Sequence, residues 1–217
     1  MKIIAYNASP RKQWNTAMLL ESALKGAATA GAETQLIHLY DIDYTGCQSC
    51  FECKRKGGKN YGRCALRDGL SPILESIKEA DAAIFGSPVY FGNVTGALRS
   101  FLERLWFPYL IYTDREDKSL FPRRLNTLFV YTTHDTQSAL KTAGIYKTLS
   151  GNEHISNMLL KGESASYYCT ETLQFSDYSK YVYDILDENE RIRRRREVFP
   201  LQLIELFELG RKLAENI

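Results

Sequence analysis

The sequence predicts an α/β fold in which a doubly wound, parallel, five-stranded sheet carries helices on both faces. Three observations support this class: short apolar segments alternate with amphipathic helical segments, the third apolar segment is largely hydrophobic, as expected of a strand covered on both faces, and polar loops follow several of the segments. The chain has 217 residues and shows neither an internal repeat nor a low-complexity linker, so we expect residues 1–217 to form a single domain.

The expected strands are rich in β-branched and aromatic residues. The first begins at Lys2 and is stopped by Ser9-Pro10. The third is almost wholly apolar, which is typical of a strand that is covered on both faces. The five strands are expected at residues 2–8, 34–40, 81–86, 126–132 and 165–172.

Apolar residues recur at helical spacing between these strands. The first helix begins at Asn15-Thr16 and has a natural stop at Gly31. Further helices are expected at residues 70–80, 94–106 and 137–149, and a last one carries the stripe Leu203, Leu206, Phe207, Gly210 and Leu213. Residues 107–124 are interpreted as an insertion, and residues 176–196 remain unassigned.

Composition and charge exclude several classes of protein. The formal net charge is only +2, which does not indicate a nucleic-acid-binding protein. No apolar run approaches the roughly 20 residues that span a bilayer, and the apolar part of the N-terminal segment is too short for a signal peptide. The five cysteines are odd in number and crowded, unlike a disulfide framework. We therefore expect a cytoplasmic protein with no membrane and no nucleic-acid partner.

Ligands of an open doubly wound sheet bind beyond the carboxyl ends of its strands. After the first strand comes SPRKQWNT, a polar loop that leads into a helix N-terminus, where free N–H groups and the helix dipole favour a phosphate. The loop matches neither G-x-x-x-x-G-K-[ST] nor G-x-G-x-x-G, so we expect a small phosphate monoester rather than a nucleoside triphosphate or a dinucleotide. The candidate phosphate ligands are Ser9, Arg11, Asn15 and Thr16.

The loop after the third strand, GSPVYFGN, combines Gly and Pro with two aromatic residues. Such a backbone lets a flat ring approach closely, so that its N–H and C=O groups can contact the rim of the ring. A phosphate loop next to a ring-binding loop suggests FMN. The candidate ring contacts are Pro88, Val89, Tyr90, Phe91, Gly92 and Asn93, with Thr133 and His134 closing the far side after the fourth strand.

These motifs carry a family resemblance. SPRK-x2-NT, GSPVYFGNVTGALRSFLER and the final ELGRKLAE resemble the NADPH-dependent FMN reductase family of flavodoxin-like proteins. The closest resemblance within it is to the iron–sulfur flavoprotein branch, whose cysteine loop is matched here by Gly46, Cys47, Cys50, Cys53, Gly62, Cys64 and Asp68. The resemblance covers about residues 1–105 and the final helix. It implies a flavodoxin-like fold, FMN as cofactor, NAD(P)H as co-substrate, and a homodimer or homotetramer.

The cysteine-rich loop, residues 46–65, has several interpretations. Cys47, Cys50 and Cys53 could wrap three corners of a [4Fe–4S] cluster, with Cys64 as the fourth ligand. The long interval before Cys64 raises the ordering entropy of such a site, although only slightly. We therefore favour reduced thiols without metal over a cluster, and zinc or a redox disulfide remain alternatives. The fifth cysteine, Cys169, is expected to be a small buried hydrophobe.

The basic run RIRRRR, residues 191–196, could recognise the 2′-phosphate of NADPH or a nucleic acid. Glu188, Glu190 and Glu197 flank it, so we favour a solvated helix face.

Three functional hypotheses follow. The favoured one is an FMN-dependent NAD(P)H oxidoreductase that passes a hydride to the flavin and on to a quinone, a free flavin or a redox protein. No catalytic acid or base is assigned, because the cofactor carries the chemistry. The second is an electron carrier with a cluster on the cysteine loop, and the third is a flavin-free binding module on the same scaffold.

Overall fold

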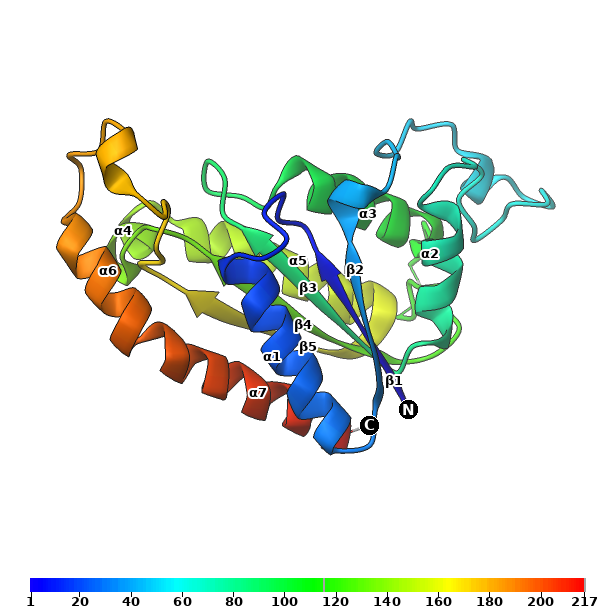
Figure 1. Cartoon of the computed structure of the whole chain (residues 1–217). Helices are drawn as coiled ribbons and strands as arrows, with labels where there is room; N and C mark the ends of the chain where they lie inside the picture. Colours follow the sequence, from blue (N-terminus) through cyan, green and yellow to red (C-terminus); the bar gives the residue numbers. More distant parts are fainter. Residues whose placement is uncertain (115, 217) are drawn as a thin grey trace.

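A computed structural model, which describes residues 1–114 and 116–216, shows a parallel sheet with the strand order β2-β1-β3-β4-β5 (Figure 1). This is the order of flavodoxin-like folds, so the predicted fold class is confirmed. The order reverses between β1 and β3, which makes their carboxyl ends the switch point of the sheet. The strands are β1 (Lys2–Asn7), β2 (Glu33–His38), β3 (Ala82–Pro88), β4 (Leu125–Thr132) and β5 (Lys161–Cys169).

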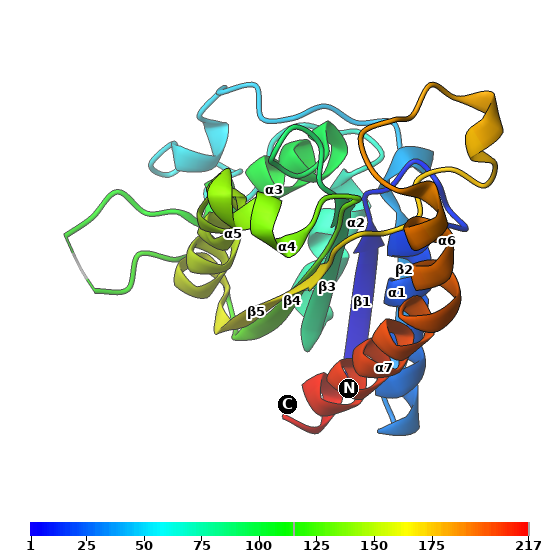
Figure 2. The same cartoon turned by 90° about the vertical axis from the view of Figure 1, so that its left-hand side faces the viewer.

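Helices cover both faces of the sheet (Figures 1 and 2). α1 (Asn15–Thr29) and α7 (Phe199–Glu215) lie on one face, and α2 (Ser71–Ser76), α3 (Gly96–Tyr109) and α5 (Ile145–Leu160) lie on the other. Successive strand residues point to opposite layers: Ile3 and Ala5 pack under α1 and α7, whereas Ile4 and Tyr6 pack under the other helices. This double burial explains why the central strands are apolar throughout.

The two helices on the first face pack backbone to backbone. A Cβ on Gly210 of α7 would lie 1.9 Å from the carbonyl oxygen of Ala23, and one on Gly26 of α1 would lie 1.8 Å from that of Phe207. Neither position therefore has room for a side chain. The C-terminal helix thus fixes the position of α1, whose N-terminus lies at the carboxyl edge of the sheet.

Several element boundaries differ from the predictions. The helix expected at residues 137–149 is two helices, α4 (Gln137–Thr142) and α5, because Gly144 has a φ of 69° and breaks the run. The strand expected at residues 165–172 begins earlier and ends at Cys169. The helix expected at residues 70–80 shortens to α2, followed by the 3-10 turn Ile77–Glu79.

The two segments that fitted poorly also have defined structure. α3 extends into the expected insertion as far as Tyr109, and residues 110–114 and 116–124 form a loop in which Leu110 pairs with Ser119; residue 115 lies outside the described residues. Residues 176–196 contain the 3-10 turn Tyr178–Lys180, and α6 (Glu188–Glu197) begins within them. Across the described part of the chain, none of the helices is long and apolar enough to cross a membrane.

Candidate functional site

The carboxyl ends of the central strands are connected by backbone hydrogen bonds that continue beyond the strands. Ala8 N–H donates to the Gly86 carbonyl at 2.8 Å, Val89 N–H to Thr132 at 2.8 Å, and Thr133 N–H to Cys169 at 3.0 Å. Four strand exits are thereby held side by side. The polar loops that follow them form one continuous rim.

A cavity of about 440 Å³ opens at this rim. Its volume falls within the range of small-molecule sites. The structure brings together eleven of the twelve predicted flavin ligands around it, namely Ser9, Arg11, Asn15, Thr16, Pro88, Val89, Tyr90, Phe91, Gly92, Thr133 and His134.

The exception is Asn93, whose side chain is used within its own loop. Its Oδ1 accepts from Val94 N–H at 2.8 Å, and its backbone pairs with Tyr90 in both directions. Residues 90–93 form a tight turn in which Phe91 (φ 50°) and Gly92 (φ 79°) both have positive φ. Phe91 is fully exposed, so this strained turn presents an aromatic ring to solvent beside the cavity.

The N-terminus of α1 forms one end of the cavity. Its N-cap position makes no side-chain capping bond, yet Asn15, Thr16 and Ala17 are buried. Buried backbone N–H groups at a helix start require an acceptor, and the helix dipole favours one that is negatively charged. The hydroxyl of Ser9 accepts from Arg11 N–H at 3.2 Å, which leaves its own proton for a ligand.

The other predicted phosphate ligands already contact the chain. Arg11 Nη1 donates to the Gln174 carbonyl at 2.6 Å, and Asn15 Nδ2 donates to the Leu173 carbonyl at 2.9 Å. Thr16 Oγ1 lies 2.8 Å from Thr132 Oγ1. Arg11 and Asn15 therefore hold the loop that follows β5 against the loop at Ser9, and Thr16 contacts the end of β4.

Sequence reasoning missed several residues of this cavity. It inspected three strand exits but not the exit of the fifth strand, although the same rule applies to it. The remaining lining residues are Trp14, Thr132, Asp135, Thr172, Leu173 and Gln174.

The basic run of α6 is only partly the solvated face that the flanking glutamates indicated. Arg193 and Arg196 are exposed, and Arg193 pairs with Glu190 and Glu197, but other arginines of the run face inward. Arg191 is 3% exposed, and its Nη1 lies 3.2 Å from Oε1 of Glu171. The other carboxylate oxygen of Glu171 pairs with Arg194. Arg195 stacks on Phe199, 4.2 Å from the ring centroid, and donates to Asn15 Oδ1 at 2.9 Å. Because a helix of ten residues turns its side chains in all directions, charge spacing alone could not show which arginines face inward.

The four loop cysteines, Cys47, Cys50, Cys53 and Cys64, gather around a second, very small cavity of about 20 Å³. Arg104 Nε donates to Cys64 Sγ at 3.0 Å, and Cys47 N–H donates to Glu103 Oε2 at 3.2 Å. Burial raises the pKa of the Cys53 thiol. Cys169 is buried elsewhere, as predicted, and burial raises its pKa to about 12.

The arrangement of these thiols bears on the choice of metal. Within the described residues, no three His, Cys, Asp or Glu side chains come close enough together to hold a metal ion. A single Zn²⁺ requires all its sulfur ligands about 2.3 Å from one point. An iron–sulfur cluster is wider and takes its thiolates at separate corners, and N–H donors to its sulfur ligands are common. Among the described residues, the loop therefore holds no preformed site for a single ion such as Zn²⁺.

Fold and cavity together define a flavodoxin-like protein with a cavity at the switch point of its sheet. The chain belongs to the NADPH-dependent FMN reductase family, whose sequence profile matches residues 1–125.

Individual relatives agree with this assignment. The chain is 40% identical over 104 residues to an iron–sulfur flavoprotein of Methanocaldococcus jannaschii, covering 48% of this chain and 51% of the relative. It is 38% identical over 104 residues to an iron–sulfur flavoprotein of Archaeoglobus fulgidus, covering 48% of each. The chain thus spans about half the length of the curated relatives it matches. The NAD(P)H:quinone oxidoreductase of Methanothermobacter marburgensis has a similar fold, with a TM-score of 0.70 at 18% identity over 98% of this chain and 96% of that one.

Proposed function

We propose that this chain is an FMN-dependent NAD(P)H oxidoreductase that passes a hydride from a nicotinamide to the flavin and on to a quinone, a free flavin or another acceptor. The observation that carries the proposal is the buried, uncapped N-terminus of α1 in a cavity at the switch point. The family membership of residues 1–125 supports it.

The residues present fit FMN. The N–H groups of Asn15, Thr16 and Ala17, with the Ser9 hydroxyl and the Arg11 guanidinium, would hold the phosphate. The backbone of Pro88, Val89 and Tyr90 would line one side of the ring, and Thr133 and His134 the other. Bound FMN would supply hydride and single-electron transfer. The protein would contribute orientation and a partly closed pocket, with residues 1–217 acting as one unit.

Flavin titration tests the proposal. The protein should bind FMN in preference to FAD and then oxidise NADH or NADPH with a quinone as acceptor. Arg11→Ala should weaken FMN binding about tenfold by removing a charge-assisted contact. Lys12→Ala is the matched control, because Lys12 pairs with Asp41 outside the cavity. Preference for FAD, or no flavin binding, would favour the flavin-free binding module instead.

A second function has a specific observation in its favour. Four cysteines around one cavity, with Arg104 donating to Cys64, support an iron–sulfur electron carrier, as do the names of the relatives. Protein purified anaerobically should then contain roughly four irons per chain with matching sulfide. Both should vanish in Cys50→Ala. If no metal is present and NAD(P)H oxidation survives Cys50→Ala, the simple flavin enzyme stands.

We further propose that the protein is a cytoplasmic homodimer or homotetramer that serves a small-molecule acceptor or a redox protein. The fully exposed ring of Phe91 beside the cavity supports a subunit contact there. Light scattering coupled to size exclusion measures the mass directly. A monomer at every concentration would exclude this part of the proposal.

A further inference from the structure

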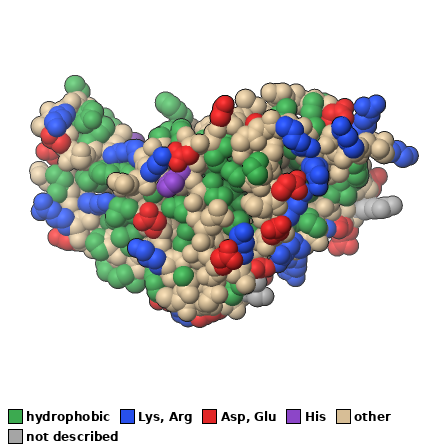
Figure 3. Space-filling view, turned by 45° about the vertical axis from the view of Figure 1, so that its right-hand side comes forward, with side chains coloured by type: hydrophobic (Ala, Val, Ile, Leu, Met, Phe, Trp, Pro, Cys, Tyr) green, Lys and Arg blue, Asp and Glu red, His purple; other side chains and the backbone are tan. Residues whose placement is uncertain are grey.

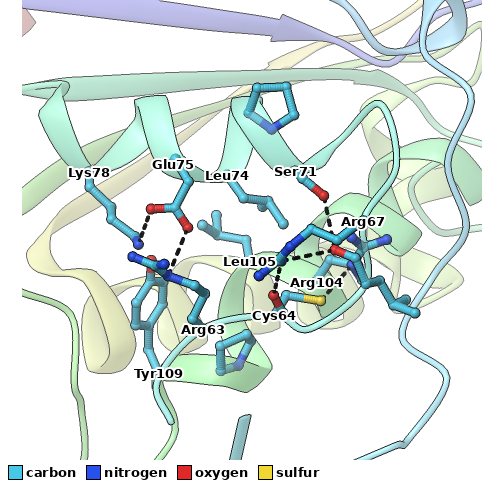
Figure 4. Close-up of a pocket in the computed structure, with 13 residues that line it drawn as sticks. Arg63, Cys64, Arg67, Ser71, Leu74, Glu75, Lys78, Arg104, Leu105 and Tyr109 are labelled. Atoms are coloured by element: carbon cyan, nitrogen blue, oxygen red, sulfur yellow. Dashed lines mark hydrogen bonds and ion pairs between the residues drawn. The ribbon is translucent and has the colours of Figure 1, made fainter. Parts of the chain in front are cut away.

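A second large cavity, of about 310 Å³, lies between α2, the end of α3 and residues 63–67 at the end of the cysteine-rich loop (Figure 4). It shares no lining residue with the cavity at the strand exits. Nothing in the flavin chemistry proposed above uses it. Its lining consists of Arg63, Cys64, Leu66, Arg67, Ser71, Pro72, Leu74, Glu75, Lys78, Arg104, Leu105, Pro108 and Tyr109.

The lining is strongly cationic. It contains three arginines and one lysine, and Glu75 is its only carboxylate. Arg104 is fully buried and its charge is matched by Asp68, whose Oδ2 lies 2.7 Å from Arg104 Nη1. Arg63 and Lys78 share the single carboxylate of Glu75, at 3.4 Å and 2.6 Å. The cavity therefore has an excess of positive charge, in line with the basic side chains that gather at this end of the molecule (Figure 3).

One of these cations has free donors. Arg63 approaches Glu75 through Nε, and its two Nη atoms make no hydrogen bond within residues 1–114 and 116–216. Arg67 is held by the chain itself: its Nη1 donates to the carbonyl oxygens of Cys64 at 2.8 Å and Leu66 at 3.3 Å, and its Nη2 donates to Asn60 Oδ1 at 3.4 Å. Guanidinium groups of this kind match the oxygens of carboxylates and phosphates.

One wall of the cavity is apolar. Leu74, Leu105 and Tyr109 are buried, and Pro72 and Pro108 flank them. Figure 4 shows Glu75 and Lys78 projecting from α2 toward Arg63, with the ring of Tyr109 beside it. A ligand with a charged group at one end and a small apolar body at the other would match both parts.

We propose that this cavity is a ligand site for a small organic anion, one that carries a carboxylate or phosphate group on a short aromatic or aliphatic body. The anionic group binds between Arg63, Arg67 and Lys78, and the body packs on Leu74, Leu105 and Tyr109. Cys64 and Arg104 line both this cavity and the small cysteine cavity. The bound anion therefore lies next to the cysteine loop, where its charge opposes the accumulation of further negative charge on the thiols.

Calorimetric titration at low ionic strength tests the site, since salt weakens exposed ion pairs. The probes are benzoate, phenyl phosphate, inorganic phosphate and benzyl alcohol. Benzoate and phenyl phosphate distinguish a carboxylate ligand from a phosphate ester. Inorganic phosphate lacks the apolar body, and benzyl alcohol lacks the charge. At least one aromatic anion should bind about tenfold more tightly than both inorganic phosphate and benzyl alcohol.

Two variants should act in opposite directions. Arg63→Gln removes a donor and should weaken binding of that anion about tenfold. Glu75→Gln removes the competing carboxylate and should strengthen binding roughly threefold. Arg55→Gln is the matched control: Arg55 also pairs with a glutamate, Glu52, but lies outside the cavity, so affinity should not change.

Three results would overturn the proposal. The first is that the aromatic anions bind no more tightly than benzyl alcohol. The second is that Arg63→Gln leaves the affinity for these anions unchanged. The third is that Glu75→Gln weakens their binding, as Arg63→Gln is expected to do. Arg11→Ala, in the other cavity, should leave binding intact. The outcome is therefore independent of whether the chain binds FMN.

Discussion

The loops that line the cavity at the strand exits and the cysteine loop all follow strands of the sheet, but they are held in place in different ways. The loops of the cavity are positioned by the sheet, because the backbone hydrogen bonds between β1, β3, β4 and β5 continue into the residues that follow these strands. The cysteine loop, residues 46–65, consists of irregular chain, turns and one short 3-10 helix, Glu52–Lys54. Its attachment to the rest of the molecule relies on individual side chains.

Two cations contribute several of these contacts. Arg104 of α3 donates to the Thr45 carbonyl at 2.9 Å, to Asp68 and to Cys64. The ammonium of Lys54, within the loop, donates to backbone carbonyls at the end of α3, among them Phe107 and Leu110. We expect a site positioned by the sheet to tolerate the loss of one side chain better than a loop that is attached through individual side chains. The predictions below test this difference.

The largest effect should come from the face that positions α1. Gly210→Ala places a Cβ against the carbonyl group of Ala23, which forces the two helices apart and should lower the free energy of unfolding by about 3 kcal/mol. Urea denaturation measures the loss. Gly151→Ala is the control, because nothing lies within 4 Å of its added Cβ; it should instead stabilise α5 by about 0.5–1 kcal/mol. Equal effects at both positions would contradict the close packing.

Arg104→Gln should release the cysteine loop. We expect a loss of about 2–3 kcal/mol of stability, below the full cost of breaking a buried ion pair because Asp68 still reaches water. FMN affinity should not change, since the strand exits do not depend on Arg104. A parallel fall in FMN affinity would show that the two regions are coupled.

The pH dependence of stability gives a check on the same contact. The hydrogen bond from Arg104 lowers the pKa of Asp68 below its ordinary value of 3.8. A carboxyl whose pKa is lower in the folded protein stabilises it above the unfolded pKa, and that contribution is lost as the pH falls through the folded pKa. The melting temperature should therefore fall as the pH is lowered below about 4. This fall should be less steep in Arg104→Gln than in the unmodified protein.

A smaller effect is expected from Arg195, which orients Asn15 at the start of α1. Arg195→Gln should lower FMN affinity about tenfold while leaving riboflavin affinity unchanged, because riboflavin has no phosphate. Arg196→Gln is the matched control, since Arg196 is exposed one position further along α6. If both flavins lose affinity equally, Arg195 supports the fold rather than the phosphate site.

The smallest effect concerns the strained turn. Phe91→Asn replaces a residue that tolerates positive φ poorly with one that tolerates it well, so stability should rise by about 1 kcal/mol. If the exposed ring contacts a nicotinamide, an acceptor or a second subunit, turnover should fall at the same time. Thermal melting and steady-state kinetics on one preparation separate the two effects. Unchanged turnover would remove Phe91 from the site.

The sequence predicted what the sheet determines. The parallel sheet with helices on both faces and eleven of the cavity residues follow from local patterns, because parallel strands bring their exits to one edge. Contacts made by single side chains across long sequence distances were not predictable. Arg195 meets Asn15 across 180 positions, and Arg104 meets Cys64 across 40, with no periodicity to mark either. The break at Gly144 was missed because a glycine within a helical pattern is usually tolerated.

The contacts of α1 with the distant part of the chain also impose an order in time. The loop that starts at Ser9 leaves the ribosome well before Leu173, Arg195 and the helix that contains Gly210, which hold it in the folded protein. At roughly 5–20 residues per second, about ten seconds or more of synthesis separate these segments. A nascent chain therefore carries this loop long before the contacts that position it can form. A ligand that depends on those contacts can bind only after α7 has been made.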